Sequence, residues 1–357
     1  MQNVLEQFQA TIRAASAQAM PVQIRGGDTK HFYGNRIAAH SYTLLDTAAY
    51  HGIVDYEPTE LVITARCGTR LIDLQAVLAR HDQMLAFEPP LFGESATLGG
   101  CIATGLSGPR RATAGAARDF VLGVRMLNGR GEELNFGGRV MKNVAGYDIA
   151  RLMVGSLGTL GLLLEVSLKV LPKPPMESTL HMTMDAASAI EKMNRWAGRP
   201  LPISATCYVD GGLFVRLSGA ESAVRAAQAR LGGEAVSDDT LFWQSIREQT
   251  HDFFHNDGSL WRLSIKSTTL PLVLPGKQLI EWNGGLRWLM CDAGCDSAEI
   301  RKIAKAAGGH ATLFRDDGLN IAAFQPLDRG MMEIHRVLKG KFDPSGILNP
   351  GRLYFEF

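Results

Sequence analysis

The chain is poor in the features that mark secreted, membrane-spanning and nucleic-acid-binding proteins. Only five cysteines are scattered through 357 residues, and an odd number of separated thiols is typical of a reduced interior rather than a disulfide framework. No apolar run approaches the ~20 residues that a helix needs to cross a bilayer, and no signal-peptide pattern opens the sequence. A net charge of +1 leaves no basic excess for nucleic acid. We therefore expect a cytoplasmic protein with no direct membrane span and no nucleic-acid partner.

Two common nucleotide-binding motifs are also missing. A Rossmann site needs G-x-G-x-x-G between a strand and a helix, but Gly129-Arg-Gly131 continues as Glu-Glu-Leu and is typical of a turn between strands. A P-loop needs G-x-x-x-x-G-K-[S/T], but Gly276-Lys277 is followed by Gln-Leu. The sequence argues against both kinds of site.

Metal signals are weak. Cys291 and Cys295 are four positions apart, and no second cysteine pair or nearby histidine completes a cluster. His251 and His255 lie one helical turn apart, which suits zinc, but the H-E-x-x-H pattern and a third ligand are missing. We expect no metal.

What the chain does contain is two glycine-rich segments about seventy residues apart. The first spans residues 21–34 around Arg25-Gly26-Gly27, and the second spans residues 88–111 around Gly99-Gly100. Glycines let backbone N–H groups approach an anion closely, and consecutive N–H groups in such a turn form an anion-binding nest. Two nests suit a diphosphate, and so predict a dinucleotide cofactor.

The order of further motifs carries a resemblance to a known family. The motifs are residues 25–29 (RGGDT), 97–100 (TLGG), 118–123 (RDFVLG), 142–148 (KNVAGYD) and 155–161 (GSLGTLG). Together they resemble the FAD-binding domain of the vanillyl-alcohol-oxidase family, also called the PCMH type. Residues 342–351 (FDPSGILNPG) resemble the C-terminal signature of its D-2-hydroxyacid dehydrogenase branch. With residues 56–66, 281–288 and 307–312, nearly the whole chain resembles the FAD-binding E subunits of bacterial glycolate oxidases.

The resemblance implies an FAD site on both glycine segments. The backbone of residues 26–30 and 97–100 would cradle the diphosphate, and residues 158–162 would run along the adenosine. Thr29 stands where some relatives attach FAD through a histidine, so non-covalent FAD is expected. The expected cofactor-binding residues are Arg25, Gly26, Gly27, Asp28, Thr29, Lys30, Gly34, Pro90, Thr97, Gly99, Gly100, Thr104, Ser107, Gly108, Arg110, Arg111, Gly158, Gly161, Leu162 and Asn349.

The expected fold class is α+β with two units. Residues 1–175 would form a two-subdomain FAD-binding domain that the C-terminal tail, residues 340–357, completes. The proline cluster at 172–175 marks the boundary. Beyond it the pattern strand, helix, strand, strand, helix is followed by a similar set: strands at 260–266, 279–282 and 287–291, with a hairpin at Asn283-Gly284, and a helix from residue 296. This predicts a ferredoxin-like cap over residues 176–339 built from two related halves, although the sequence shows no clean repeat.

The sequence supplies no clear catalytic residue. Hydride loss from a 2-hydroxy acid needs a base for the hydroxyl proton and a cation for the carboxylate. The family's catalytic members carry histidines around a Gly-Asp-Gly-Asn segment and a Glu-His-Gly segment. Here the nearest counterpart is residues 316–320 (DDGLN), flanked by Phe314, Ile321 and Ala322, and Glu-His-Gly is absent. Catalytic residues therefore stay unknown, and the isolated chain is expected to react slowly.

The function expected from the resemblance is the FAD-binding subunit of a glycolate oxidase complex. Its partners would be a second FAD-containing subunit, an iron–sulfur subunit and a small 2-hydroxy acid, with membrane association only through partner subunits. Two alternatives stay open at this point. One is a self-sufficient FAD-dependent 2-hydroxyacid dehydrogenase, and the other is a flavin-free scaffold subunit.

Overall fold

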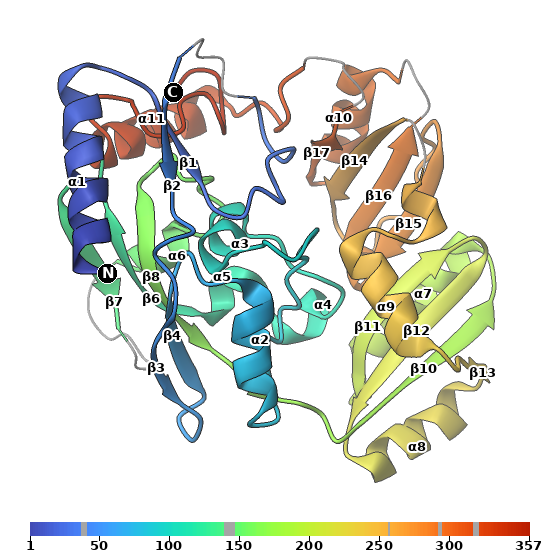
Figure 1. The fold of residues 1–357 in the computed structure, drawn as a ribbon. Helices are drawn as coiled ribbons and strands as arrows, with labels where there is room; N and C mark the ends of the chain where they lie inside the picture. Colours follow the sequence, from blue (N-terminus) through green and yellow to red (C-terminus); the bar gives the residue numbers. More distant parts are fainter. Residues whose placement is uncertain (37–40, 139–146, 256–257, 292–294, 317–320) are drawn as a thin grey trace.

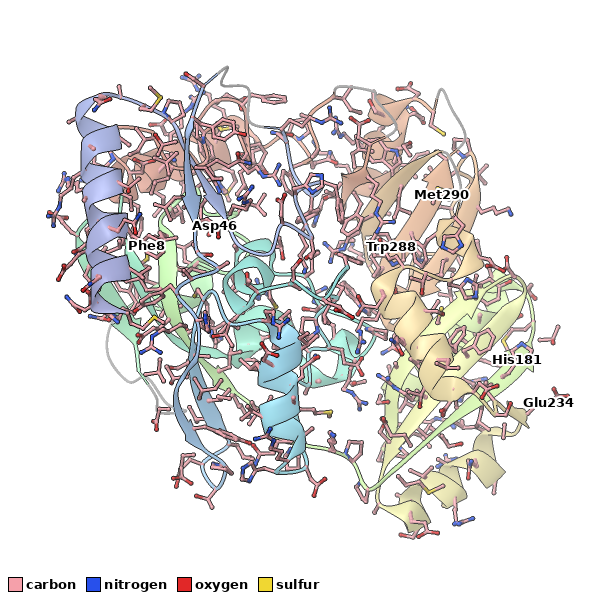
Figure 2. All side chains as sticks on the ribbon, viewed as in Figure 1. Phe8, Asp46, His181, Glu234, Trp288 and Met290 are labelled. Atoms are coloured by element: carbon pink, nitrogen blue, oxygen red, sulfur yellow. The ribbon has the colours of Figure 1, made fainter. Side chains whose placement is uncertain are left out.

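The computed structural model describes residues 1–36, 41–138, 147–255, 258–291, 295–316 and 321–357, and these form two units side by side (Figure 1). The first unit begins with helix α1 (Gln2–Ala17), followed by the parallel pair β1 (Val22–Arg25) and β2 (Thr43–Asp46). Apolar residues of α1, among them Phe8 (labelled in Figure 2), recur at helical spacing and are buried. The Phe8 ring meets the Tyr50 ring edge-on, with the ring centroids 6.0 Å apart.

A five-stranded antiparallel sheet forms the centre of the first unit. Its strand order is β3-β4-β8-β6-β7. The strands are β3 (Ile53–Glu57), β4 (Val62–Arg66), β6 (Val121–Leu127), β7 (Glu133–Gly137) and β8 (Leu162–Lys169). The central strand β8 is buried along nearly its whole length, as its apolar run indicates.

Short helices cover this sheet and carry the second glycine-rich segment. They are α2 (Leu71–Ala79), α3 (Leu98–Thr104), α4 (Arg111–Ala114), α5 (Ala117–Phe120) and α6 (Ile149–Leu152). Thr97 caps α3 by accepting the N–H of Gly100, and Asp148 caps α6 by accepting the N–H of Arg151 at 3.2 Å. A small ladder joins β5 (Gln83–Met84) to β9 (Leu171–Pro172) just before the predicted boundary.

The second unit is one eight-stranded sheet made of two ferredoxin-like halves. Its order is β13-β10-β12-β11-β15-β16-β14-β17. The first half holds β10 (Met176–Thr183), α7 (Ala186–Ala197), β11 (Ile203–Val209), β12 (Gly212–Gly219), α8 (Glu221–Leu231) and β13 (Glu234–Ala235). The second holds β14 (Ser259–Ser264), β15 (Lys277–Glu281), β16 (Leu286–Cys291), α10 (Ser297–Ala306) and β17 (His310–Arg315). Each half has the order 4-1-3-2, so the two-half arrangement predicted from the sequence is present.

The second half departs from the first where a helix would follow its first strand. Residues 265–276 connect β14 to β15 mostly without regular structure, whereas α7 makes the corresponding connection in the first half. The 3₁₀ turn η2 (Trp282–Gly284) joins β15 to β16, and within it Asn283 and Gly284 have positive φ (56° and 98°).

One face of the eight-stranded sheet is turned toward the first unit. Helix α9 (Asp239–Glu248) and the 3₁₀ turn η1 (Asp252–Phe254) pack on it, and its apolar residues form one core with Tyr33, Leu106 and Leu157 of the first unit. Trp288 and Met290 belong to this face, whereas His181 and Glu234 pair at the far end of the sheet (Figure 2). The two units therefore share a continuous apolar interface.

The last helix belongs to the first unit rather than to the cap. Helix α11 (Arg329–Phe342) buries Lys339, whose Nζ donates to the carbonyl of Thr159 at 2.8 Å. Phe342 packs against Phe136 of the five-stranded sheet. The sequence placed α11 in the cap because it follows the cap strands directly. Its tertiary contacts put the return to the first unit before residue 329 instead of at 340.

No helix in the described part of the chain is long and apolar enough to cross a membrane. All five cysteines are free thiols, and only Cys295 is partly exposed.

Candidate flavin site

A cavity of about 580 Å³ lies in the first unit, a volume typical of small-molecule sites. The first glycine-rich loop, α3, residues 157–163 and the C-terminal segment form its wall, and β17 reaches it from the cap. Fifteen of the twenty residues expected to bind the cofactor line it: Arg25, Gly26, Gly27, Asp28, Thr29, Lys30, Gly34, Thr97, Gly99, Gly100, Thr104, Gly158, Gly161, Leu162 and Asn349. The two glycine segments, distant in sequence, thus meet at one cavity.

The first loop presents unpaired backbone donors to this cavity. Among the described residues, the N–H groups of Gly26, Gly27, Asp28 and Thr29 donate to no protein acceptor. Asp28 has φ +58°, a left-handed conformation that aspartate tolerates better than most residues. Four consecutive free N–H groups bent by a left-handed residue form an anion-binding nest.

The glycines are required because the two loops touch each other. A Cβ added to Gly27 would lie 1.6 Å from the carbonyl oxygen of Ser95, and one added to Gly26 would lie 2.4 Å from Thr97 Oγ1. Ser95 Oγ also donates to the Gly27 carbonyl at 2.7 Å. The contact between the segments therefore sets the shape of the nest.

Three cations of the cavity wall add positive charge. Lys30 is buried, and its Nζ donates to the Leu91 carbonyl at 2.9 Å. Arg352 donates to the carbonyls of Asn35 and His31, each at 2.6 Å, and Arg36 also lines the wall. Burial lowers the pKa of both Lys30 and Arg352. Because none of the three makes an ion pair with a described carboxylate, the wall suits an anionic ligand such as a diphosphate.

The C-terminal segment completes the wall. Asn349 Oδ1 accepts the N–H of Ile24 at 2.8 Å, and its Nδ2 donates to the Leu157 carbonyl at 2.7 Å. This one side chain therefore joins the strand before the nest to the loop that carries Gly158. A Cβ at Gly158, which has φ +73°, would lie 2.7 Å from Asn349 Nδ2.

Five expected residues lie outside this cavity. Pro90, Ser107 and Gly108 line a second, much smaller cavity, and Arg110 and Arg111 line neither.

For Arg110 the structure departs from the expected diphosphate contact. Its guanidinium pairs with Glu88 (Nε to Oε1, 3.3 Å) and with Glu177 of the cap (Nη2 to Oε1, 2.6 Å). Arg216 of β12 joins the same carboxylate of Glu88 at 2.9 Å. The arginine is thus neutralised at the interface between the units, away from the nests.

Arg111 stands in a different environment at the same interface. Its guanidinium stacks over the Trp282 ring at 4.3 Å, and Arg262 of β14 lies over the same ring at 5.2 Å. Neither guanidinium has an ion-pair partner in the described part of the chain, although Arg262 bonds the Tyr33 hydroxyl. Burial, and then the neighbouring Arg262, lower the pKa of Arg111 to about 10. His310 lies near both arginines, and burial together with the two cations lowers its pKa. Two arginines that lack an ion-pair partner among the described residues thus lie over one indole ring.

The small cavity has a volume of about 20 Å³ and lies beside this arginine pair. Arg262, Glu281 and Gln249 line it together with Phe92 and Phe314. The rings of Phe92 and Phe314 meet Phe32, which lines the large cavity, at 5.6 and 5.5 Å. The two cavities are therefore neighbours, joined by the contacts of Phe32 with Phe92 and Phe314.

The structure gathers no metal site within the described ranges, in which no three His, Cys, Asp or Glu side chains cluster. His251 Nδ1 instead accepts the N–H of Phe253. Of the residues considered for catalysis, Phe314 is buried in the interface core and Ile321 lines the large cavity. Residues 317–320 and 142–146 of the predicted motifs lie outside the described residues.

Four residues of these sites escaped the sequence analysis: Arg36, Arg352, Arg262 and Glu281. A signal existed for Arg352, which directly follows the Asn-Pro-Gly signature. Arg262 gave only the signal of a charged residue inside an apolar strand pattern, and Glu281 stood in the family segment 281–288 without an assigned role. Strand pairing brings the two residues to the same face of the sheet.

Comparison with known proteins agrees with this geometry. A family model described as an FAD binding domain matches residues 4–137. Over 356 residues, 99% of this chain and 97% of the relative, the chain is 47% identical to glycolate oxidase subunit GlcE of Escherichia coli. It is 30% identical to glycolate oxidase subunit GlcD of Bacillus subtilis over 51% of this chain and 39% of that protein. It is 32% identical to D-2-hydroxyglutarate dehydrogenase of Xanthomonas citri over 50% of this chain and 38% of that protein.

Solved structures share the fold at low sequence identity. The chain superposes on p-cresol methylhydroxylase with a TM-score of 0.70 and 14% identity, covering 99% of this chain and 88% of that one. Alkyldihydroxyacetonephosphate synthase gives a TM-score of 0.67 at 16% identity, with 98% and 76% covered. The architecture is therefore the PCMH-type FAD-binding fold.

Proposed function

The chain belongs to the family of the glycolate oxidase subunit GlcE, and from this premise we propose that it is the FAD-binding subunit of a complex that oxidises a small 2-hydroxy acid. The observation that carries the proposal is the large cavity, where four free N–H groups and three unpaired cations converge. When bound there, FAD would supply a two-electron acceptor for the hydride of the substrate α-carbon.

Different residues of the cavity would hold different parts of the cofactor. The N–H groups of Gly26 to Thr29 and the side chains of Lys30 and Arg352 would hold the diphosphate. The wall from Gly158 to Leu162 would run along the adenosine, with Asn349 fixing its position. Thr29 cannot form the bond that a histidine forms with the flavin, so the cofactor is held without a covalent bond.

The arginine pair is the position we propose for the substrate carboxylate. Arg111 and Arg262 lie over the Trp282 ring at the interface between the units, and Arg262 lines the small cavity beside the flavin cavity. A carboxylate between two guanidiniums gains charge-assisted hydrogen bonds and relieves their mutual repulsion. Substrate would therefore enter between the cap and the FAD-binding domain.

The printed name of the Escherichia coli relative makes that protein one subunit of a glycolate oxidase. We propose a second flavoprotein subunit and an iron–sulfur subunit as partners that receive the electrons. The experiment is anaerobic mixing of the assembled complex with glycolate or D-lactate while the flavin absorbance near 450 nm is followed. Bleaching by either acid supports the function. An unchanged flavin spectrum with every 2-hydroxy acid tested would refute it.

A further inference from the structure

A buried carboxyl group with one free oxygen faces the small cavity. Glu281, the last residue of β15, is 4% exposed, and its Oε2 accepts the indole N–H of Trp288 at 2.8 Å. Its Oε1 has no partner among the described residues, and neither does Oε1 of the buried Gln249, which lines the same cavity. A buried polar atom without a partner is costly. A hydrogen-bond donor in the small cavity would therefore satisfy an oxygen that the protein leaves without a partner.

The size of the small cavity limits which donor can enter it. A volume of about 20 Å³ has room for one water molecule or one hydroxyl group. A hydroxyl group donates one proton, and an ionised carboxylate oxygen is the stronger of the two acceptors. Arg262 lines the same cavity, so a molecule whose carboxylate lies on the Arg111–Arg262 pair can place an adjacent hydroxyl here. A 2-hydroxy acid has its hydroxyl on the carbon next to the carboxylate.

We propose that Glu281 is the general base that takes the hydroxyl proton of the 2-hydroxy acid. The inference rests on the proposed function. In the step, the O–H bond breaks and its proton goes to Glu281 Oε1, while the α-C–H bond breaks and its electron pair leaves with the hydrogen as hydride. The carbinol becomes a carbonyl, FAD is the oxidant, and Glu281 ends as a neutral carboxylic acid.

The surroundings suit a group that must gain and lose a proton near neutral pH. Burial raises the pKa of Glu281 to about 7, although the Trp288 hydrogen bond and Arg262 act to lower it. Glu88 also raises this pKa and Arg216 lowers it, and the buried Cys207 on β11 is neutral because burial raises its thiol pKa well above the usual value. Only the ionised form can accept a proton. The rate should therefore rise with pH through about 7.

The test compares Glu281→Gln with Glu299→Gln in the FAD-loaded complex. Glutamine keeps an oxygen for the Trp288 indole but cannot take a proton, and Glu299 is a partly exposed glutamate of α10 paired with Lys302. Glu281→Gln should slow flavin reduction by ~10²–10⁴-fold and flatten the rise with pH. Glu299→Gln should leave both unchanged, and Glu281→Asp should restore part of the rate.

A second readout does not depend on turnover. Oxalate has a carboxylate where the substrate has its hydroxyl, so its binding should raise the pKa of Glu281 and draw a proton from solvent. Calorimetry in two buffers of different ionisation enthalpy should show uptake of about half a proton at pH 7 in the wild type, and none in Glu281→Gln.

If glycolate reduces the flavin of the wild type, and Glu281→Gln shows the same rate and the same pH profile, the inference is overturned. A wild type that no 2-hydroxy acid reduces would instead refute the proposed function and the base assignment with it.

Discussion

Glu88 forms ion pairs across the interface between the two units, and its replacement should lower the free energy of unfolding. Its side chain is 14% exposed and holds Arg110 of the first unit and Arg216 of the cap, and its Oε2 accepts the Arg110 N–H at 2.9 Å. The substitution Glu88→Gln keeps the shape of the side chain and removes its charge. Two buried guanidiniums would then share Glu177, at 2.6 and 4.0 Å.

The magnitude follows from this geometry. Removing one partner of a buried ion pair typically costs 3–5 kcal/mol, and the remaining Glu177 places the expected loss near the lower limit, at about 3 kcal/mol. Glu221→Gln is the matched control, because Glu221 pairs with Arg225 at 2.7 Å with both side chains 66% exposed. Its loss should stay below about 0.5 kcal/mol.

The assay is equilibrium urea unfolding followed by tryptophan fluorescence across a range of pH. Burial alone would raise the pKa of Glu88, but Arg216 and Arg110 more than offset it and hold the pKa below its usual value. A lowered folded-state pKa gives a stabilisation that is complete above the unfolded value of about 4.3 and is lost as the pH falls through the folded value. The gap between wild type and Glu88→Gln should therefore be constant near neutrality and close in acid. Equal losses in Glu88→Gln and Glu221→Gln would refute the reasoning.

Three further predictions concern the sites. Gly100→Ala should lower FAD affinity at least ~10-fold, because Gly100 lines the cavity and an added methyl group would take space from the cofactor. The methyl group would meet only Thr97 Oγ1 within the protein, at 3.4 Å. Gly340→Ala adds a methyl group in open space and should not change the FAD titration. Arg111→Ala should raise the KM for glycolate while leaving the FAD content unchanged, and a lowered FAD content would contradict its placement outside the cavity. Lys339→Met should lower the free energy of unfolding by ~3–5 kcal/mol, because Asp343 and the carbonyls of Thr159 and Leu348 lose the ammonium group that donates to them. A urea midpoint like that of the wild type would contradict this.

The first nest could be predicted because a glycine-rich loop carries its chemistry in the backbone. The second nest expected at residues 97–100 is not formed, because the N–H groups of Leu98, Gly99 and Gly100 donate to Thr69 O, Cys67 O and Thr97 Oγ1 within the protein. Gly26, Gly27 and Gly100 line the cavity that their spacing predicted, since what matters there is the absence of a side chain. Side-chain partners are decided by tertiary contacts instead. Arg110 was assigned to an anion site on its local sequence, but its partner Glu177 comes from a strand of the other unit.

The same reason explains why the interface site was missed. Arg262 and Glu281 lie on different strands, and only the pairing of β14, β15 and β16 brings them to one face. The succession of strands and helices sufficed to predict the two ferredoxin-like halves, because local periodicity indicates the elements and this succession is typical of that fold. It did not show that α11 leaves the cap, since an amphipathic helix does not specify which surface it covers.

The central claim is that this chain holds FAD without a covalent bond in the cavity between its two glycine segments. The most direct measurement is acid precipitation of the purified holoprotein, followed by identification of the flavin in the supernatant and the pellet. All flavin should appear in the supernatant as FAD, in an amount equimolar with the protein. Flavin that stays with the pellet, a supernatant that contains FMN, or a colourless protein that cannot be loaded with FAD would contradict it.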